Sequence, residues 1–271
     1  MKLSRRVVQH TLSLVVSLVI AALPSQAATL SLSGSSLSLS NFNQSPQSTA
    51  SSTNTNTFTA APNALDSANA LATAEANFIS VPSPSVTNNS VSLALGQGGS
   101  YSGLGQSQAQ NLGTFFVEAN QSLSFSFGSS LFLQAAADDP FLENANSIGN
   151  LSFFVRDSES QYIYGSFDLS GNLATQNNGD FLNFQVGNNI TLASTPSLQS
   201  AFGGNQELAQ ASVNGSFDYL FTQPTAVTLS AFTDNQVNVQ AVPENVNPIA
   251  FLLFGFMGIG LRAWKQSRVR G

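Results

Sequence analysis

Residues 121–134 read QSLSFSFGSSLFLQ, and the spacing of their apolar side chains indicates the fold class. Leu123, Phe125 and Phe127 lie at every second position, with a serine before each of them. Because successive side chains of a strand point to opposite faces, this spacing predicts a strand with one apolar and one polar face. Residues 131–133 are apolar on both faces, which is typical of a strand in the middle of a sheet.

The same period of two recurs on both sides of this stretch, and glycine or asparagine separates most of the segments. About ten strands with turns between them predict an all-β fold, a β-sandwich or jelly-roll-like antiparallel domain. The alternating apolar positions are Leu30, Leu32, Leu37, Leu39, Val91, Leu93, Leu95, Leu151, Phe153, Val155, Ile163, Phe167, Leu169, Leu182, Phe184, Val186, Val213, Phe217, Tyr219, Phe221, Val227, Leu229, Val237 and Val239.

Two segments near the beginning of the body have weaker patterns. Residues 41–62 are rich in Ser, Thr, Asn and Gln. We expect 28–62 to be a flexible segment that has room for one first strand, and the sandwich domain to span 63–241. Alanine occupies every second position from Ala68 to Ala76. This period favours a strand with a face of small residues, and a helix is the alternative because alanine is a strong helix former.

Charge is distributed unevenly along the 271 residues. The formal net charge is −6, but the body between Ala28 and Val242 holds thirteen acidic residues and one basic residue, Arg156. A body of net charge about −12 cannot neutralise phosphates, which excludes nucleic-acid binding. Only 8% of the chain is charged, against about a quarter in ordinary soluble proteins, and this favours export. Arg156 lies beside Asp157 and Glu159, so we expect an ion pair at a strand end.

The body contains few of the side chains that catalysis uses. The only histidine, His10, precedes the body, and the chain has no cysteine. This composition excludes Ser-His-Asp and Cys-His catalysis, as well as zinc sites built from those ligands. Two carboxylates would suffice for glycoside hydrolysis, but thirteen acidic residues make chance pairs common. We therefore expect no enzyme activity and no catalytic residues.

One acidic cluster has the composition of a calcium site. Asp138, Asp139 and Glu143 supply carboxylates of the kind that Ca²⁺ accepts in extracellular β domains. Their spacing does not follow the EF-hand pattern, and Pro140 supports the alternative that Asp138 and Asp139 shape a turn. Calcium is the only cofactor that the sequence suggests.

The first 27 residues have the order of a secretory signal peptide. A basic start precedes the apolar stretch 12–23, and a small-x-small site at 25–27 follows it. Signal peptidase is therefore expected to cut before Ala28. The alternative is a retained anchor, although the apolar stretch is shorter than the roughly 20 residues that a membrane span needs.

The last thirty residues, 242–271, resemble the PEP-CTERM sorting signal of exported bacterial proteins. The resemblance implies a membrane segment over 246–264, a cytoplasmic basic end over 262–271 and processing by an exosortase-like enzyme. The alternative is a buried helix of the domain. The matching residues are Val242, Pro243, Glu244 and Asn245 for the motif, with Asn245 where the family has its second proline, and Arg262, Lys265, Arg268 and Arg270 for the basic end.

The body resembles a group of cyanobacterial exported proteins that carry the same tail and have no established activity. The likeness implies no catalytic residues. The segments that carry it are 137–140 (ADDP), 170–173 (SGNL), 180–182 (DFL) and 201–207 (AFGGNQE).

These features predict an exported structural or interaction protein of the cell envelope, outer surface or extracellular matrix. The tail would anchor it at least transiently in the inner membrane, and extracellular polysaccharide is the expected surrounding partner. The alternative is a lectin-like carbohydrate-binding module assisted by calcium, an interpretation that rests on fold analogy. The rings of such a site would come from Tyr101, Tyr162, Tyr164 or Tyr219.

Overall fold

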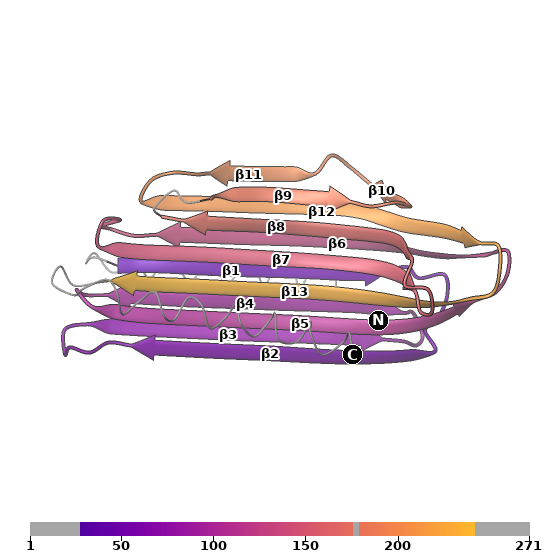
Figure 1. Cartoon of the computed structure of the whole chain (residues 1–271), viewed down its shortest axis with the longest axis horizontal. Coiled ribbons are helices and arrows are strands. Elements are labelled where there is room, and N and C mark those ends of the chain that lie inside the picture. Colours follow the sequence, from indigo (N-terminus) through magenta and orange to yellow (C-terminus); the bar gives the residue numbers. More distant parts are fainter. Residues whose placement is uncertain (1–27, 176–178, 242–271) are drawn as a thin grey trace. The chain divides into compact units, whose positions relative to one another are not determined.

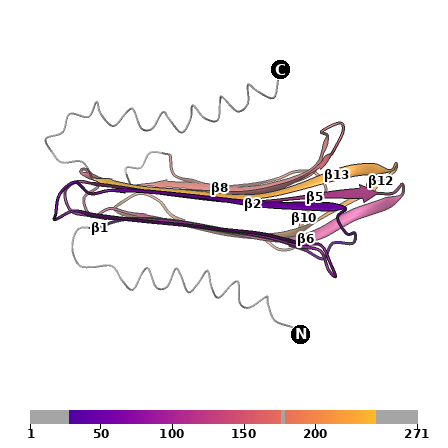
Figure 2. The same cartoon turned by 90° about the horizontal axis from the view of Figure 1, so that it is seen from below.

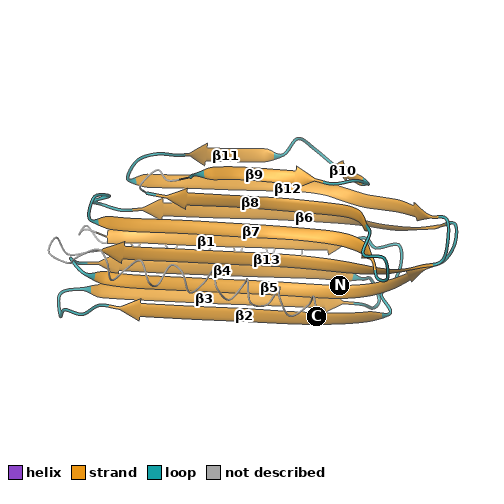
Figure 3. Cartoon of the chain, in the orientation of Figure 1, coloured by secondary structure: helices purple, strands orange, loops and turns teal. Residues whose placement is uncertain are grey.

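A computed structural model describes residues 28–175 and 179–241 of the chain. Across these residues the fold is all-β, with two antiparallel sheets stacked as two layers (Figure 1, Figure 2). The expected all-β sandwich is confirmed. None of these residues lies in a helix that could cross a membrane (Figure 3). The predicted signal helix and C-terminal membrane helix fall in 1–27 and 242–271, outside the described residues.

The two layers are a seven-stranded and a six-stranded sheet. The seven-stranded sheet has the order β10-β12-β6-β1-β4-β3, and β11 also pairs with β12. The six-stranded sheet has the order β2-β5-β13-β7-β8-β9. The strands are β1 (Ala28–Ser40), β2 (Ser48–Ala60), β3 (Ser67–Ile79), β4 (Ser85–Gln97), β5 (Tyr101–Val117), β6 (Gln121–Ala136), β7 (Glu143–Asp157), β8 (Ile163–Ala174), β9 (Phe181–Val186), β10 (Ile190–Leu192), β11 (Ser197–Ala201), β12 (Gln206–Phe221) and β13 (Thr225–Ala241).

Strand β6 contains the alternating stretch 121–134 and behaves as its sequence predicts. It pairs with β1 on one side and with β12 on the other, so it lies inside its sheet. Leu123, Phe125 and Phe127 are buried between the layers, and the serines between them are only partly buried.

The sequence pattern predicts burial of leucine in β1 and β4. All four leucines of β1 are buried, but serine also fills much of the space between the layers. The Ser33 hydroxyl donates to the backbone carbonyl of Ile148 on the facing sheet at 2.8 Å. In β4, Ser90 and Ser92 are buried, whereas Leu93 lies on the outer face and is half-buried. The periodicity therefore identified the strands correctly and assigned the wrong side of β4 to the core.

The alanine-rich segment 64–78 forms strand β3, so the favoured interpretation is confirmed. Its alanines pair in register with inward positions of β4, for example Ala70 with Ala94 and Ala72 with Ser92. Small side chains on this face let the opposite sheet approach closely, which a helix would not have allowed.

Residues 41–62 were expected to be flexible, and this expectation is wrong for most of the segment. Residues 48–60 form β2, which pairs with β5 from Ser48↔Thr114 to Ala60↔Ser102. Threonine favours extended backbone, and the ladder to β5 pairs the inner half of the β2 backbone groups without burying any β2 side chain. Together with β1, this strand extends the sandwich back to Ala28.

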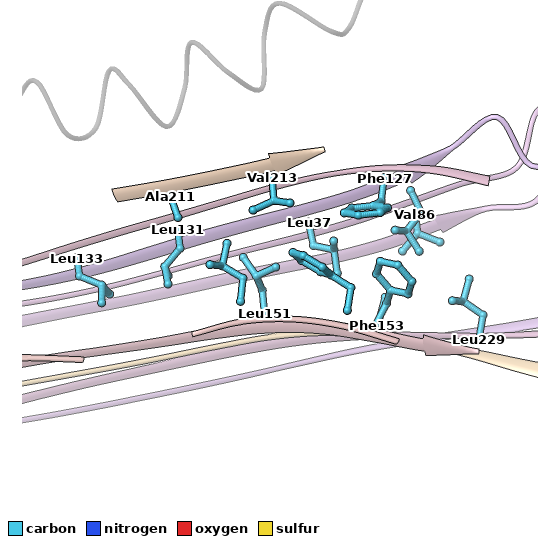
Figure 4. Close-up of a cluster of buried hydrophobic side chains, with 14 of the residues drawn as sticks. Leu37, Val86, Phe127, Leu131, Leu133, Leu151, Phe153, Ala211, Val213 and Leu229 are labelled. Atoms are coloured by element: carbon cyan, nitrogen blue, oxygen red, sulfur yellow. The ribbon is translucent and has the colours of Figure 1, made fainter. Parts of the chain in front are cut away.

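One part of the core is aromatic. We call it the aromatic region (Figure 4 shows part of it). Phe153 contacts Phe125, Phe127 and Phe167, with ring centroids 5.4, 5.1 and 5.8 Å away. Each buried phenylalanine stabilises the fold by about 1.5–3 kcal/mol. The region comprises Phe42, Phe115, Phe125, Phe127, Phe153, Phe167 and Phe217.

Another part of the core, the serine region, is built from small and polar side chains. At its centre, Asn235 Oδ1 lies 2.7 Å from Ser33 Oγ and shares the single proton of that hydroxyl with the Ile148 carbonyl. Asn235 Nδ2 donates to Ser35 Oγ (2.9 Å) and to the Ser90 carbonyl (2.7 Å). The Ser147 hydroxyl donates across the layers to the backbone of β1. The region comprises Ser31, Ser33, Ser35, Ser90, Ser92, Ser107, Asn111, Ser147 and Asn235.

Candidate functional site

The outer side of the six-stranded sheet presents amide side chains on neighbouring strands, and we call this surface the amide face. Its members lie at every second position of their strands, opposite the inward positions that fill the core. They are half-buried or exposed. The amide face comprises Asn54, Asn56, Gln106, Gln108, Gln110, Asn144, Asn146, Asn150, Asn172, Asn183, Gln236 and Asn238.

Strand register aligns these side chains into rows that cross the sheet. One row runs Asn54, Gln108, Asp234, Asn150, Ser170 and Asn183, one residue from each of the six strands. With strands about 4.8 Å apart, such a row is about 24 Å long. Contacts link neighbours within the face: Asn56 Nδ2 donates to Gln106 Oε1 at 3.3 Å, and Asn146 Nδ2 donates to Asn172 Oδ1 at 3.2 Å.

The chemistry of the amide face suits neutral, hydroxyl-rich partners. Every amide side chain offers both a hydrogen-bond donor and an acceptor. Because an amide is neutral, a partner that covers it does not have to remove a charge from water. Such a surface can hydrogen-bond along an extended polar chain, and Asp234 is the one carboxylate in the row described.

Three of the four tyrosines gather at the ends of β7, β8 and β12, and we call this group the tyrosine cluster. The Tyr162 and Tyr164 rings are 5.1 Å apart, and those of Tyr164 and Tyr219 are 4.8 Å apart. Tyr162 is 58% exposed, and Phe221 supports the other two rings from the core side. Tyr101 does not join them, because it is buried at the beginning of β5.

Polar groups fix the tyrosine cluster in place. The Tyr164 hydroxyl donates to Asp157 Oδ2 at 3.1 Å, and burial together with this carboxylate raises the pKa of Tyr164 to about 12. Asp157 Oδ1 accepts the backbone N–H groups of Ser160 and Glu159, and these bonds lower the pKa of Asp157. The hydrogen bond to Asp157 therefore holds the Tyr164 hydroxyl, and with it the ring, in one orientation.

Arg156 does not form the expected ion pair within the described part of the chain. Its Nη1 donates to Gln161 Oε1 at 2.7 Å, and its guanidinium lies 5.6 Å from the ring centroid of Phe154. The carboxylate of Asp157 is directed instead to the turn that follows β7.

The predicted calcium ligands do lie together, at the other end of β7, but the Glu143 carboxylate accepts hydrogen bonds from the backbone of the turn that precedes this strand. Glu143 Oε2 accepts the backbone N–H groups of Asp138 (3.0 Å) and Asp139 (3.2 Å). Glu143 Oε1 accepts the hydroxyl of Tyr101 at 3.1 Å. Over residues 28–175 and 179–241, no three acidic or histidine side chains are grouped so that they could hold a metal ion. The calcium site stays a prediction that gains no support from this arrangement.

A second buried acid lies at the beginning of β12. Glu207 is 1% exposed, and its Oε1 accepts the backbone N–H of Gly203 at 3.2 Å. Among the described residues no donor lies in hydrogen-bond geometry to its Oε2, although the Asp180 carboxylate is nearby. Burial, with the nearby Asp180 carboxylate, raises the pKa of Glu207 to about 7. Because Glu207 is buried, it is not placed to contact a substrate.

The sequence singled out the tyrosines but missed the amide face. The sequence does contain a pattern typical of this face, glutamine or asparagine at every second position, in Gln106-Ser107-Gln108 and Asn54-Thr55-Asn56. From sequence alone this pattern predicts only a polar strand face, because the register that aligns neighbouring strands is not known. The sorting motif (Val242, Pro243, Glu244, Asn245) and the basic end (Arg262, Lys265, Arg268, Arg270) lie outside the described residues. Comparison of the chain with models of known protein families, with curated proteins and with solved structures found no match.

Proposed function

We propose that the protein is an exported, non-catalytic structural and interaction protein of the cell envelope or extracellular matrix, and that its amide face contacts polysaccharide. The observation that carries the proposal is the row of polar side chains across all six strands, five of them uncharged and one, Asp234, acidic. A glycan chain offers hydroxyl donors and acceptors over a comparable length, and amides match both. Export through a signal peptide at 1–27 and sorting by the tail at 242–271 belong to the same proposal.

The first residue of β1 supports the proposed removal of the signal peptide. The backbone nitrogen of Ala28 donates to Asp138 Oδ2 at 2.7 Å. Cleavage before Ala28 would convert this nitrogen into a charged amine, whose ordinary pKa is about 8. Asp138 would then hold the new N-terminus in an exposed ion pair worth about 0–1 kcal/mol. Mass spectrometry of the surface-associated protein tests the cleavage, since a chain that retains residues 1–27 contradicts it.

The polysaccharide contact is tested by co-sedimentation of the mature protein with the extracellular polysaccharide of its host. Gln236→Glu combined with Asn238→Asp keeps the shape of the amide face and removes two donors. We expect about fivefold weaker binding or more, because each lost hydrogen bond contributes about 0.5–1.5 kcal/mol. Binding by the unaltered protein should change little with salt, since no ion pair is involved.

The matched control changes the same residue types on the outer face of the other sheet. Gln210→Glu combined with Asn214→Asp on β12 adds the same charge. If both double variants lose binding equally, general repulsion is the cause and the amide face is not the contact surface. No binding by the unaltered protein contradicts the proposal.

A second candidate function, lectin-like sugar binding, is favoured by the tyrosine cluster. Tyr162 and Tyr164 form an edge-to-face pair at the surface, with Asp157 and Asn189 beside them. Sites that bind sugars combine aromatic faces, against which the sugar ring packs, with nearby polar groups that hydrogen-bond its hydroxyls. Tyr162→Ala would abolish binding of short oligosaccharides if this site is functional, and Phe141→Ala, which removes a ring that is 93% exposed elsewhere, would not. Equal binding by both variants excludes the tyrosine cluster.

A further inference from the structure

Over residues 28–175 and 179–241, the sandwich has two long strand edges on the same side that no further strand pairs with. β2 is the edge of the six-stranded sheet and β3 is the edge of the seven-stranded sheet. Each is thirteen residues long, and Figure 1 shows them next to each other at the lower side. In an edge strand, half of the backbone N–H and C=O groups point away from the sheet and can pair with another strand.

Neither open edge carries the features that usually prevent pairing. β2 has no charged residue and no proline, and β3 has no proline and one charged residue, Glu75. Proteins commonly protect an edge with lysine, proline, a bulge or a very short strand. Large apolar side chains are exposed on both edges as well, including Phe58 on β2 and Leu71 and Ile79 on β3.

The opposite side of the sandwich is protected. Its edge strands are β9 with six residues, β10 with three and β11 with five. Pro196 directly precedes β11, and Gly203 and Gly204, both with positive φ, follow it after Phe202. The contrast indicates that only the β2 and β3 side is suited to extended pairing.

The centres of the two open edges lie one above the other. Gly105 pairs with Thr57 of β2, and the Leu71 carbonyl of β3 lies 3.1 Å from the place that a Cβ of Gly105 would take. Farther along, Gly113 pairs with Thr49 and lies against the Phe78 ring. The middle of β2, at Asn54, therefore faces the middle of β3, near Thr73.

We propose that a second copy of this chain pairs with these edges, β2 with β2 and β3 with β3, about one two-fold axis perpendicular to the sheets. A partner that pairs with both edges must have two strand edges separated by the same distance as the two sheets. A second copy of this chain meets this requirement because it has the same two edges. Pairing centred on Asn54 and Thr73 is antiparallel in both layers. It places Glu75 opposite Leu71 of the other copy, so the two acidic side chains do not face each other. Because the far edges are short, assembly ends at the dimer.

The cysteine-free chain allows a direct test. A single cysteine near the axis meets its own copy at about 4.5–5.5 Å between Cα atoms, a distance that a disulfide can bridge. Full-length protein, exported by its host with Ser52→Cys, Asn54→Cys or Asn56→Cys, should give a covalent dimer on a non-reducing gel at one of these positions. Asn183→Cys on β9 is the control and should remain monomeric. No dimer at any β2 position, or equal dimer from Asn183→Cys, overturns the proposal.

A second measurement does not depend on oxidation. Native mass of the purified full-length protein is expected to be that of a dimer, and Asn54→Lys combined with Thr73→Lys should halve it. The matched pair Asn183→Lys and Gln210→Lys should leave the mass unchanged. A monomeric unaltered protein, or a dimer that survives the edge lysines, contradicts edge pairing. The inference does not depend on the proposed function, because neither measurement uses polysaccharide.

Discussion

The aromatic and serine regions hold the same two sheets together by different means. In the aromatic region, large rings fill the space between the layers, so burial of apolar surface supplies the stabilisation. In the serine region, the backbones come close enough for hydroxyls of one sheet to bond carbonyls of the other, as Ser33 does with Ile148. The first arrangement tolerates small shifts of its members. The second requires fixed positions, because hydrogen bonds depend on distance and angle.

The largest expected effect belongs to the aromatic region. Phe153→Ala should lower the free energy of unfolding by about 3–5 kcal/mol, because three neighbouring rings lose a partner and a cavity remains. Urea denaturation followed by tyrosine fluorescence measures it. Phe141→Ala, at an exposed ring, should change stability by less than about 0.5 kcal/mol. A loss below about 1 kcal/mol for Phe153→Ala would show that the rings do not carry this part of the core.

In the serine region, Asn235→Ala should cost about 2–4 kcal/mol, because it leaves Ser33, Ser35 and Ser90 with fewer buried partners. Gln236→Ala is the control on the same strand, at an exposed position on the opposite face. If both variants have the same denaturation midpoint, the polar network contributes nothing to stability, and the proposed difference between the serine and aromatic regions is contradicted.

The spacing of the layers can be tested with Gly105→Val, for which we expect a loss of about 1–3 kcal/mol. A Cβ at Gly105 would lie 3.1 Å from the Leu71 carbonyl and 3.2 Å from the Leu93 carbonyl, both on the other sheet. The added methyl groups would have to push the layers apart. Gly99→Val, where no atom lies within 4 Å of a Cβ, should leave the melting temperature nearly unchanged.

The smallest effect concerns pH, at Glu207 on β12. Its pKa is raised to about 7 in the folded protein, so the folded state holds a proton that the unfolded state has released. This contribution to stability should therefore be full below about pH 4.5 and be lost as the pH rises to 7; solvent screening reduces the loss to about 1–2 kcal/mol. Glu207→Gln should remove this slope. Parallel pH profiles for the two proteins would show that Glu207 is not the group responsible.

How far the sequence predicts this molecule depends on which region is considered. Period-two alternation located β6, β7 and β12 because their apolar residues are also their buried residues. It assigned the wrong face to β4, since Ser90 and Ser92 are buried by partners on other strands that no local pattern identifies. Strand β2 was missed for a related reason: its stability comes from the ladder to β5, not from burial of its own side chains.

The candidate sites divide in the same way. The tyrosines could be named from composition, but their grouping required the ends of β7, β8 and β12 to be placed next to each other. The acidic cluster could be named too, yet only the structure shows that Glu143 holds the turn at Asp138 and Asp139.

The hydroxyl-to-carbonyl bonds between the layers have a mechanical consequence. Ser33 of β1 donates to β7, and Ser147 of β7 donates back to β1, so the two sheets are joined in both directions. A force along the strands that slides one sheet over the other must break these directional bonds, whereas apolar packing has no preferred direction. We therefore expect a body that resists shear along its strands, a useful property for a protein proposed to lie between a cell and its matrix.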